Sequence, residues 1–217
     1  GKYCPRMTNQ LIRLQPSEGY VLQPNHYYSQ QWFDNEQKNL FGRTWTFAGL
    51  EAQLSEVGDY LLVEVGYQPM LVTRSIDGKL NALHNVCRHR GAKMLTECGR
   101  VQGISCPYHA WRYELSGELT HVPQQTTQFP DLEMSDWGVL KGSVALWDGL
   151  VFVHADPDAQ PLSHWFAGLD KRLERFRPSR LCEINVSVYP IKANWKFFVE
   201  NHIDWLHLYY LHSSSLR

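Results

Sequence analysis

Short apolar runs separated by turn residues dominate the middle of this chain. The runs lie at residues 59–65, 70–74, 79–83, 111–115 and 150–154. Most are rich in aliphatic, β-branched or aromatic residues, which favour strands. Asp77-Gly78 and Ser116-Gly117 are typical of tight turns between strands. The pattern therefore predicts an all-β domain of short strands over residues 44–158.

A helical pattern precedes this domain. Residues 34–41 predict a short amphipathic helix with its apolar side chains on one face. Ser29 or Asp34 could cap the start of that helix, because short polar side chains accept hydrogen bonds from the first free N–H groups. We expect this N-terminal arm, residues 1–43, to pack on the β domain or on a neighbouring subunit.

The pattern changes again after the β domain. Residues 156–161 contain two prolines and are typical of a linker. A charged helix is predicted over residues 162–175, and the alternating residues 183–189 predict a strand. Residues 191–217 contain neither glycine nor proline, so this stretch predicts a helix. A second domain therefore begins at about residue 159 and occupies residues 159–217.

Two short strings inside the β domain carry chemistry. Cys87-Arg88-His89 offers one thiolate and one imidazole, and after sixteen intervening residues Cys106-Pro107-Tyr108-His109 offers the same pair. A [2Fe–2S] centre with two cysteines on one iron and two histidines on the other needs that set of donors. Such a centre moves one electron at a time.

A zinc site and a chance grouping are the two alternatives to an iron–sulfur centre for these four residues. A Cys2His2 zinc site usually spaces each pair by two to four residues and places a helix behind the second pair. Here the first pair is spaced by one residue and the flanking segments predict strands. Four unrelated residues are the other alternative, and two matched pairs on loops argue against it. The pattern favours the iron–sulfur centre.

The two strings have a wider resemblance. Residues 84–92 and 106–111 resemble the cluster loops of Rieske proteins. Respiratory-chain Rieske proteins carry two additional cysteines that form a disulfide, and those positions are Ala92 and Tyr108 here. The sequence is therefore similar to Rieske ferredoxins and ring-hydroxylating oxygenases instead. The resemblance implies that the cluster-binding residues are Cys87, His89, Cys106 and His109.

A second group of polar residues lies near the C-terminal end. Asn201, Asp204 and His207 recur every three residues and would share one face of a helix. His212 follows His207 by five residues, which on a regular helix turns the two side chains about 140° apart. Two ligands of one metal must converge, so we predict a π-bulge or the end of the helix between Leu208 and His212.

These four residues resemble the mononuclear-iron motif of Rieske non-haem iron oxygenase α subunits. The resemblance implies that His207 and His212 are ligands of an Fe(II) ion, with an Asp beyond Arg217 as the third ligand. Two histidines and one carboxylate leave positions open for O2 and substrate. Within residues 1–217 the motif therefore has two of its three expected iron ligands.

The resemblance gives Asp204 a separate role. In the family, the matching Asp links a metal-site histidine of one subunit to a cluster histidine of its neighbour, here His207 and His109. A carboxylate that accepts hydrogen bonds from two ligand imidazoles couples and tunes both sites. We expect Asp204 and Asn201 to be buried and to act in catalysis, because large apolar side chains surround them in the sequence. His202 lies off this stripe and should be at the surface.

The resemblance implies an α+β fold, with an all-β Rieske [2Fe-2S] domain followed by the start of a mixed α/β helix-grip catalytic domain. It also implies an oxygenase component, a mono- or dioxygenase that hydroxylates or demethylates a small organic substrate with O2. Electrons would come from NAD(P)H through a separate flavin reductase, and in some systems a ferredoxin. The family commonly forms homotrimers, because the cluster of one subunit serves the iron of the next.

Two alternatives remain at this stage. A Rieske ferredoxin-type electron carrier would need the cluster but no catalytic site of its own, and the segment at residues 193–212 argues against it, since a carrier has no need of a second metal motif. An incomplete reading frame would keep the cluster and lack the chemistry. The number of irons bound per chain separates these alternatives from the enzyme.

Composition narrows the possible partners and compartment. The chain has 217 residues, 43% of them hydrophobic, and a formal net charge of −1, without the basic runs that nucleic-acid binding needs. No apolar stretch is long enough for a membrane span, and the first residues do not resemble a secretory leader. Cys4, Cys98 and Cys182 are too scattered for a disulfide framework, which indicates a cytoplasmic protein. We expect Cys98, between the two cluster strings, to be structural.

Overall fold

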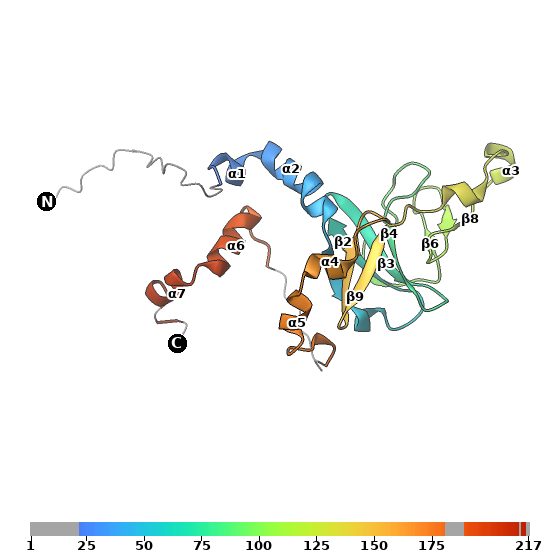
Figure 1. The fold of residues 1–217 in the computed structure, drawn as a ribbon. Coiled ribbons are helices and arrows are strands. Elements are labelled where there is room, and N and C mark those ends of the chain that lie inside the picture. Colours follow the sequence, from blue (N-terminus) through green and yellow to red (C-terminus); the bar gives the residue numbers. More distant parts are fainter. Residues whose placement is uncertain (1–21, 181–188, 213, 216–217) are drawn as a thin grey trace. The chain divides into compact units, whose positions relative to one another are not determined.

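A computed structural model describes residues 22–180, 189–212 and 214–215 of the chain (Figure 1). The chain forms two compact units. One contains Gly1–Phe33 and Ile191–Arg217, and the other contains Asp34–Pro190. None of the helices in the described ranges is long and apolar enough to cross a membrane.

Three small antiparallel sheets make up the larger unit (Figure 1). The first has the order β1-β10-β9, the second β4-β3-β2-β5 and the third β6-β7-β8. The strands are β1 (Thr46–Leu50), β2 (Asp59–Val65), β3 (Gln68–Arg74), β4 (Leu80–His84), β5 (Gly99–Arg100), β6 (Ile104–Ser105), β7 (Arg112–Tyr113), β8 (Leu119–His121), β9 (Ser143–Trp147) and β10 (Leu150–His154). The all-β domain predicted from the sequence is therefore confirmed.

Most strand boundaries agree with the apolar runs. β2 and β10 have the expected limits, and the β3–β4 hairpin turns at Gly78, whose φ of +78° suits glycine. The run at residues 111–115 differs, because only Arg112 and Tyr113 pair as a strand. The Trp111 carbonyl accepts a hydrogen bond from Cys106 N–H, and the Leu115 carbonyl accepts one from the Thr73 hydroxyl. The two ends of the run therefore bond to the second cluster loop and to β3 instead of extending the strand.

Strand β3 contributes to two separate hydrophobic cores. Met70 and Val72 pack in a core with Val151 and Val153 of β10. Leu71, on the opposite face, packs in a second core that also contains Cys87 and Cys106. Each such apolar side chain stabilises the fold by roughly 2 kcal/mol when it is fully buried. The strand that is buried on both faces thus connects the cluster loops to the rest of the β domain.

The remaining elements of the larger unit are short helices, the first of which begins in the smaller unit. They are α2 (Gln30–Asn39), η1 (Phe41–Arg43), η2 (Glu51–Leu54), α3 (Gln125–Gln128), η3 (Met134–Trp137), α4 (Leu162–Phe166), α5 (Leu169–Leu173) and η4 (Pro178–Arg180). The single helix predicted over 162–175 is wrong: it is broken at Ala167 and Gly168, which both have left-handed backbone conformations. The strand predicted at 183–189 falls almost wholly on residues 181–188, which lie outside the described residues.

The N-terminal arm is divided between the two units. Helix α1 (Asn25–Tyr28) belongs to the smaller unit, and residues from Asp34 onwards belong to the larger one. Ser29 Oγ accepts a hydrogen bond from Trp32 N–H at the start of α2, so Ser29 acts as the predicted cap. Asp34 lies inside the helix and accepts a hydrogen bond from the Tyr67 hydroxyl. The expected packing on the β domain therefore holds for the second half of the arm.

Glycine is required where α2 approaches the β2–β3 turn. Gly66 has a φ of +59°, and a Cβ atom there would lie 2.2 Å from the Gln37 carbonyl oxygen. We expect Gly66→Ala to lower the free energy of unfolding by about 3 kcal/mol, from left-handed strain plus overpacking. Thermal unfolding should shift down by roughly 6 to 12 °C. Gly78→Ala is the matched control, because Gly78 has a similar φ but open space around it. Equal shifts in the two variants would contradict the close approach.

Candidate functional site

The two loops that carry the cysteine–histidine pairs have the same backbone hydrogen bonds. In each loop the cysteine N–H donates to the carbonyl five residues later, and the N–H four residues later donates back to the cysteine carbonyl. The four bonds are Cys87 N–Ala92 O (2.9 Å), Gly91 N–Cys87 O (2.9 Å), Cys106 N–Trp111 O (2.8 Å) and Ala110 N–Cys106 O (3.0 Å). Gly91 and Ala110 both have positive φ, at +69° and +54°. The loops are therefore two copies of one local turn.

Across the two loops, the two cysteines lie in one buried core and the two histidine rings lie next to each other. The thiols of Cys87 and Cys106 are free and each cysteine is 2% exposed. The rings of His89 and His109 have their centroids 4.6 Å apart. The Nδ1 atoms of both histidines are buried without a hydrogen-bond partner. Buried polar atoms are normally satisfied, so two adjacent imidazole nitrogens without partners fit a bound metal.

This arrangement fits an iron–sulfur cluster better than zinc. A closed zinc site needs four donors around a single ion. A [2Fe–2S] centre of this type instead needs two cysteines on one iron and two histidines on the other. The four donors predicted from the sequence are thus brought together in the two pairs that such a cluster requires.

Burial and neighbouring groups shift the pKa values of two of the four cluster donors, Cys87 and His89. Burial raises the pKa of the Cys87 thiol, and the neighbouring Cys106 adds to this effect. Burial lowers the pKa of His89, and the charges of His109 and Arg90 lower it further. His89 is therefore neutral near pH 7, which is the form in which imidazole binds metals. The thiols must lose their protons when iron binds.

Aromatic rings pack against both histidines. Trp111 is 2% exposed and stacks parallel to His89, with 4.9 Å between centroids and 4° between planes. Its other neighbours include Phe129 and Trp137, which meet it edge-on. Tyr108 lies 3.9 Å from His109, centroid to centroid, but is 60% exposed. Trp111 thus belongs to the core and also shields the site, whereas Tyr108 lies at the surface.

Sequence reasoning missed Asn85, which holds the first loop from behind. This residue is fully buried two positions before Cys87. Its Oδ1 accepts hydrogen bonds from the N–H groups of Met94 and Leu95, at 3.1 and 3.0 Å. Its Nδ2 donates to the Leu95 carbonyl at 2.6 Å. A buried amide that satisfies three backbone groups fixes the loop. Its position two residues before the first ligand was the signal from which the sequence could have identified it.

Tyr113 was also missed, and it contacts a ligand directly. Its hydroxyl lies 3.2 Å from Cys87 Sγ and accepts a hydrogen bond from Arg88 N–H at 3.2 Å. Since the oxygen already accepts from Arg88, its hydrogen is free to point at the sulfur. Burial raises the pKa of Tyr113, and the hydrogen bond to Cys87 raises it further, so the phenol stays protonated. Hydrogen bonds to cluster sulfurs are one of the factors that set the reduction potential.

We expect Tyr113→Phe to keep the cluster and lower its reduction potential. The hydroxyl donor favours the more negative, reduced state, and a difference of about 1 kcal/mol between oxidation states corresponds to about 40 mV for one electron. Redox titration followed by EPR measures this shift. Tyr60→Phe is the control, because Tyr60 is a buried tyrosine of the same core. An unchanged potential in Tyr113→Phe would remove this tyrosine from the cluster environment.

The second group of site residues lies on two consecutive helices. Helix α6 (Trp195–Ile203) begins after Asn194, whose side chain accepts from Lys196 N–H, and α7 covers Leu206–Tyr210. The continuous helix predicted over 191–217 is wrong because Asp204 is extended, with φ −83° and ψ 101°. Its Oδ1 accepts a hydrogen bond from Leu206 N–H at 2.9 Å and so caps the second helix.

His207 and His212 converge at the end of α7. Their ring centroids are 5.5 Å apart. The helix ends at Tyr210, and His212 N–H reaches back five residues to the His207 carbonyl at 3.4 Å. A five-residue bond of this kind widens the turn. The prediction that the helix ends before His212 is confirmed, and this ending brings both imidazoles to the same side.

Asp204 and Asn201 do not lie as expected. Asp204 Oδ2 is 3.6 Å from His207 Nδ1, close to the ring but beyond hydrogen-bonding distance. Both Asp204 and Asn201 are exposed, so the expectation of burial is wrong for this chain. Neighbouring Trp205 and Leu206 are each 69% exposed as well, because no described residue covers this part of the unit. His202 is exposed, as predicted.

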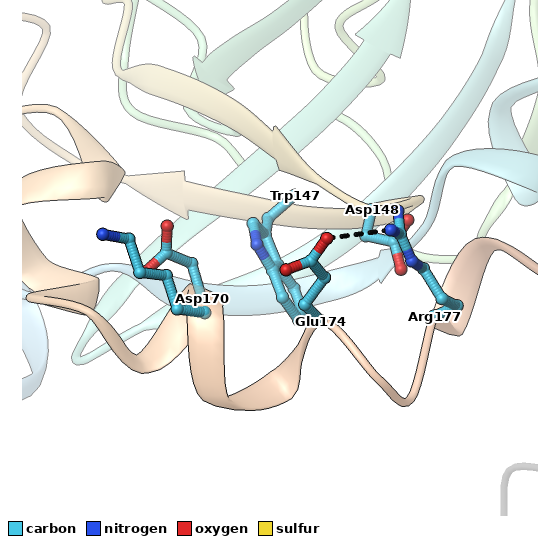
Figure 2. A pocket seen from close by; sticks show the side chains of 6 residues that line it. Trp147, Asp148, Asp170, Glu174 and Arg177 are labelled. Atoms are coloured by element: carbon cyan, nitrogen blue, oxygen red, sulfur yellow. Dashed lines mark hydrogen bonds and ion pairs between the residues drawn. The ribbon is translucent and has the colours of Figure 1, made fainter.

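Two cavities lie apart from these ligands. One of about 200 Å³ lies between the β9–β10 turn and α5 (Figure 2). It is lined by charged side chains and the Trp147 ring, and Glu174 and Arg177 form an ion pair there at 2.9 Å. A larger one, of about 610 Å³, is bordered by His84 and His154. Both of these histidines already have backbone hydrogen-bond partners. Neither cavity contains a predicted site residue.

Comparisons with protein families match both parts of the chain. A model described as "Rieske [2Fe-2S] domain" matches residues 44–139. A model described as "Ring hydroxylating alpha subunit (catalytic domain)" matches residues 178–217. The first range contains the four proposed cluster ligands, and the second contains the Asn201–His212 motif.

Curated relatives and solved structures agree with these matches. The chain is 32% identical to biphenyl 2,3-dioxygenase subunit alpha of Rhodococcus jostii (strain RHA1), over 82% of this chain and 40% of that protein. It is 28% identical to the glycine betaine monooxygenase oxygenase subunit of Pseudomonas aeruginosa (strain UCBPP-PA14), over 98% and 49%. The chain spans about half the length of the curated relatives it matches.

Among solved structures, a quaternary ammonium Rieske monooxygenase in complex with L-carnitine superposes with a TM-score of 0.80. It is 27% identical in sequence, and the match covers 89% of this chain and 56% of that one. Naphthalene 1,2-dioxygenase from Rhodococcus sp., bound to indole, has a TM-score of 0.75 at 30% identity, over 85% and 44%.

Proposed function

This chain belongs to the Rieske ring-hydroxylating oxygenase α subunits, and on that basis we propose that it is part of an oxygenase component. In this component a Rieske [2Fe-2S] cluster and a mononuclear non-haem Fe(II) together use O2 to hydroxylate or demethylate a small organic substrate. Relatives include both dioxygenase subunits and a monooxygenase subunit, so both outcomes stay open.

One observation carries the proposal: a single chain holds two donor sets of different chemistry. The β domain pairs two buried thiols with two imidazoles whose Nδ1 atoms have no partner. The helical segment brings His207 and His212 together with Asp204 beside them. An electron carrier needs only the first set, whereas an oxygenase needs both.

The residues of the chain have distinct parts in this chemistry. Cys87, His89, Cys106 and His109 would hold the cluster, and His207 and His212 would supply two ligands of the Fe(II). When bound, the cluster supplies one-electron transfer and the Fe(II) supplies O2 activation. Asp204 Oδ2 lies 3.6 Å from Nδ1 of His207. We propose that it closes to hydrogen-bonding distance when the metal binds, holds a proton on Nδ1 and leaves Nε2 for the metal. Asn201, on the preceding helix, is proposed as a further polar group of this site.

The remaining assignments are proposals of the same kind. We divide the chain into the arm at 1–43, the Rieske domain at 44–158 and the start of the catalytic domain at 159–217. NAD(P)H would supply electrons through a separate flavin reductase, with or without a ferredoxin, and the complete protein would form a homotrimer. One solved relative carries the words "inter-subunit electron transfer" in its description. Free thiols at all three described cysteines are compatible with the proposed cytoplasmic location.

Counting iron in the complete protein that carries this chain tests the proposal. We expect about three irons per chain, two in the cluster and one in the mononuclear site, and O2 uptake that depends on an added organic substrate. About two irons per chain with normal cluster EPR and no O2 uptake would identify a ferredoxin-type carrier instead. Colourless protein that binds zinc stoichiometrically would contradict the whole assignment.

A further inference from the structure

An aromatic side chain of the N-terminal arm is bonded to the helix that leads into the mononuclear-iron motif. The Tyr27 hydroxyl of α1 donates a hydrogen bond to Glu200 Oε1 of α6 at 2.5 Å, across 173 residues of sequence. Its ring lies 4.8 Å from the Phe197 ring, centroid to centroid. Both contacts lie within the smaller unit. The arm therefore packs on α6 through a polar contact and an apolar contact from one residue.

A third contact involves the buried Lys196. This residue is 4% exposed, and its Nζ lies 5.7 Å from the Tyr27 ring centroid and 5.1 Å from that of Trp195. Ammonium groups are attracted to aromatic ring faces at such distances. Tyr27 thus contacts three residues on one side of α6, namely Lys196, Phe197 and Glu200. The adjacent Tyr28, by contrast, is 79% exposed.

Glu200 connects this contact to the site. Its side chain binds Tyr27, and its backbone carbonyl accepts the last hydrogen bond of α6, from Asp204 N–H at 3.0 Å. Asp204 then leaves the helix, caps α7 through Leu206 N–H and comes to lie 3.6 Å from His207 Nδ1. A shift of the last turn of α6 would therefore move Asp204 and the start of α7, which Asp204 caps and which carries His207.

The hydrogen bond is also of a directed and comparatively strong kind. A phenol that donates to a carboxylate makes a charge-assisted bond, which is shorter and stronger than a neutral one. The bond to Glu200 raises the pKa of Tyr27, so the phenol remains a donor throughout the neutral range. The bond holds the Glu200 side chain, and with it the last turn of α6, against Tyr27 of α1.

We propose that Tyr27 is a positioning residue for the mononuclear-iron site, acting through Glu200 on the last turn of α6. This inference rests on the proposed function, because it assigns a role toward the iron that His207 and His212 would hold. It makes the N-terminal arm a part of the catalytic unit, and it predicts that removing one hydroxyl from the arm changes the environment of the iron without touching a ligand.

The test uses the complete, iron-loaded protein and the variants Tyr27→Phe and Glu200→Gln, with Tyr28→Phe as the matched control. Nitric oxide binds Fe(II) and serves as the EPR probe of the mononuclear site. We expect Tyr27→Phe to change the line shape of the nitric oxide complex and to lower kcat about tenfold at unchanged KM, while the cluster EPR signal stays the same. Glu200→Gln should give the same changes, and the double variant should be no worse than either single one. Tyr28→Phe should match the parent protein.

The outcomes separate this inference from the proposed function. A parent protein without mononuclear iron would overturn both. A parent protein with normal iron, and a Tyr27→Phe variant whose nitric oxide spectrum and kcat equal those of Tyr28→Phe, would overturn the positioning role alone. A lower unfolding temperature in Tyr27→Phe with an unchanged spectrum would also overturn it, because the contact would then be only structural.

Discussion

We expect the His109→Ala variant to lose the [2Fe–2S] cluster completely. The imidazole of His109 stands 4.6 Å from that of His89, and its Nδ1 is buried without a partner, so both histidines are needed to hold one iron. Without His109, only one of the two histidines that would hold that iron remains. Visible absorption and the EPR signal of the reduced protein should vanish, and iron should fall from about three to about one per chain.

A second histidine of the β domain provides the control. His121 lies in β8 and is exposed, outside both cluster loops. His121→Ala should therefore retain the full colour and EPR signal. Cys106→Ser should behave as His109→Ala, whereas Cys98→Ser should not, because Cys98 is an exposed thiol between the two ligand pairs. A coloured His109→Ala protein with an unchanged spectrum would refute the ligand assignment.

For Asp204→Ala we expect both metal sites to remain loaded while turnover falls by about 100-fold. The carboxylate lies beside Nδ1 of His207 and is not itself placed as a ligand. Groups in this position orient the ligand and tune the metal, and their loss typically costs 10- to 100-fold. Metal content, cluster EPR and the rate of reoxidation of the reduced cluster under O2 with substrate measure the three parts of this expectation.

The Asp204→Asn variant distinguishes the negative charge of Asp204 from its role as the cap of α7. Alanine removes the cap that Asp204 gives to Leu206 N–H, at a cost of about 1 kcal/mol, so a loss of activity could arise from a frayed α7. Asparagine keeps an oxygen that can accept this hydrogen bond but removes the negative charge. We expect both variants to be slow. An Asp204→Asn protein with normal turnover would show that the cap, and not the charge next to His207, is what the site needs.

The strands and the donor types could be predicted because their signals are local. β2 and β10 have the limits that their apolar runs predicted. The apolar residues of these runs are the ones that the fold buries in its core, so the run and the strand end together. The break at Asp204 could not be predicted in this way. No glycine or proline marks the break. The helix ends there because the Asp204 carboxylate accepts a hydrogen bond from Leu206 N–H in place of a helical bond. The break in the second predicted helix differs, because Gly168 stands beside the left-handed Ala167 and was an available signal.

Amino-acid type and spacing alone predicted the metal chemistry proposed for this protein, because two Cys–His pairs and an Asn-Asp-His-His motif carry their ligand chemistry within a few residues of chain. Folding was needed to show which groups meet. The stacking of Trp111 on His89, the contact of Tyr113 with Cys87 Sγ and the bond from Tyr27 to Glu200 join residues 22, 26 and 173 positions apart. Such contacts depend on strand pairing and helix packing, which no local pattern of residues encodes.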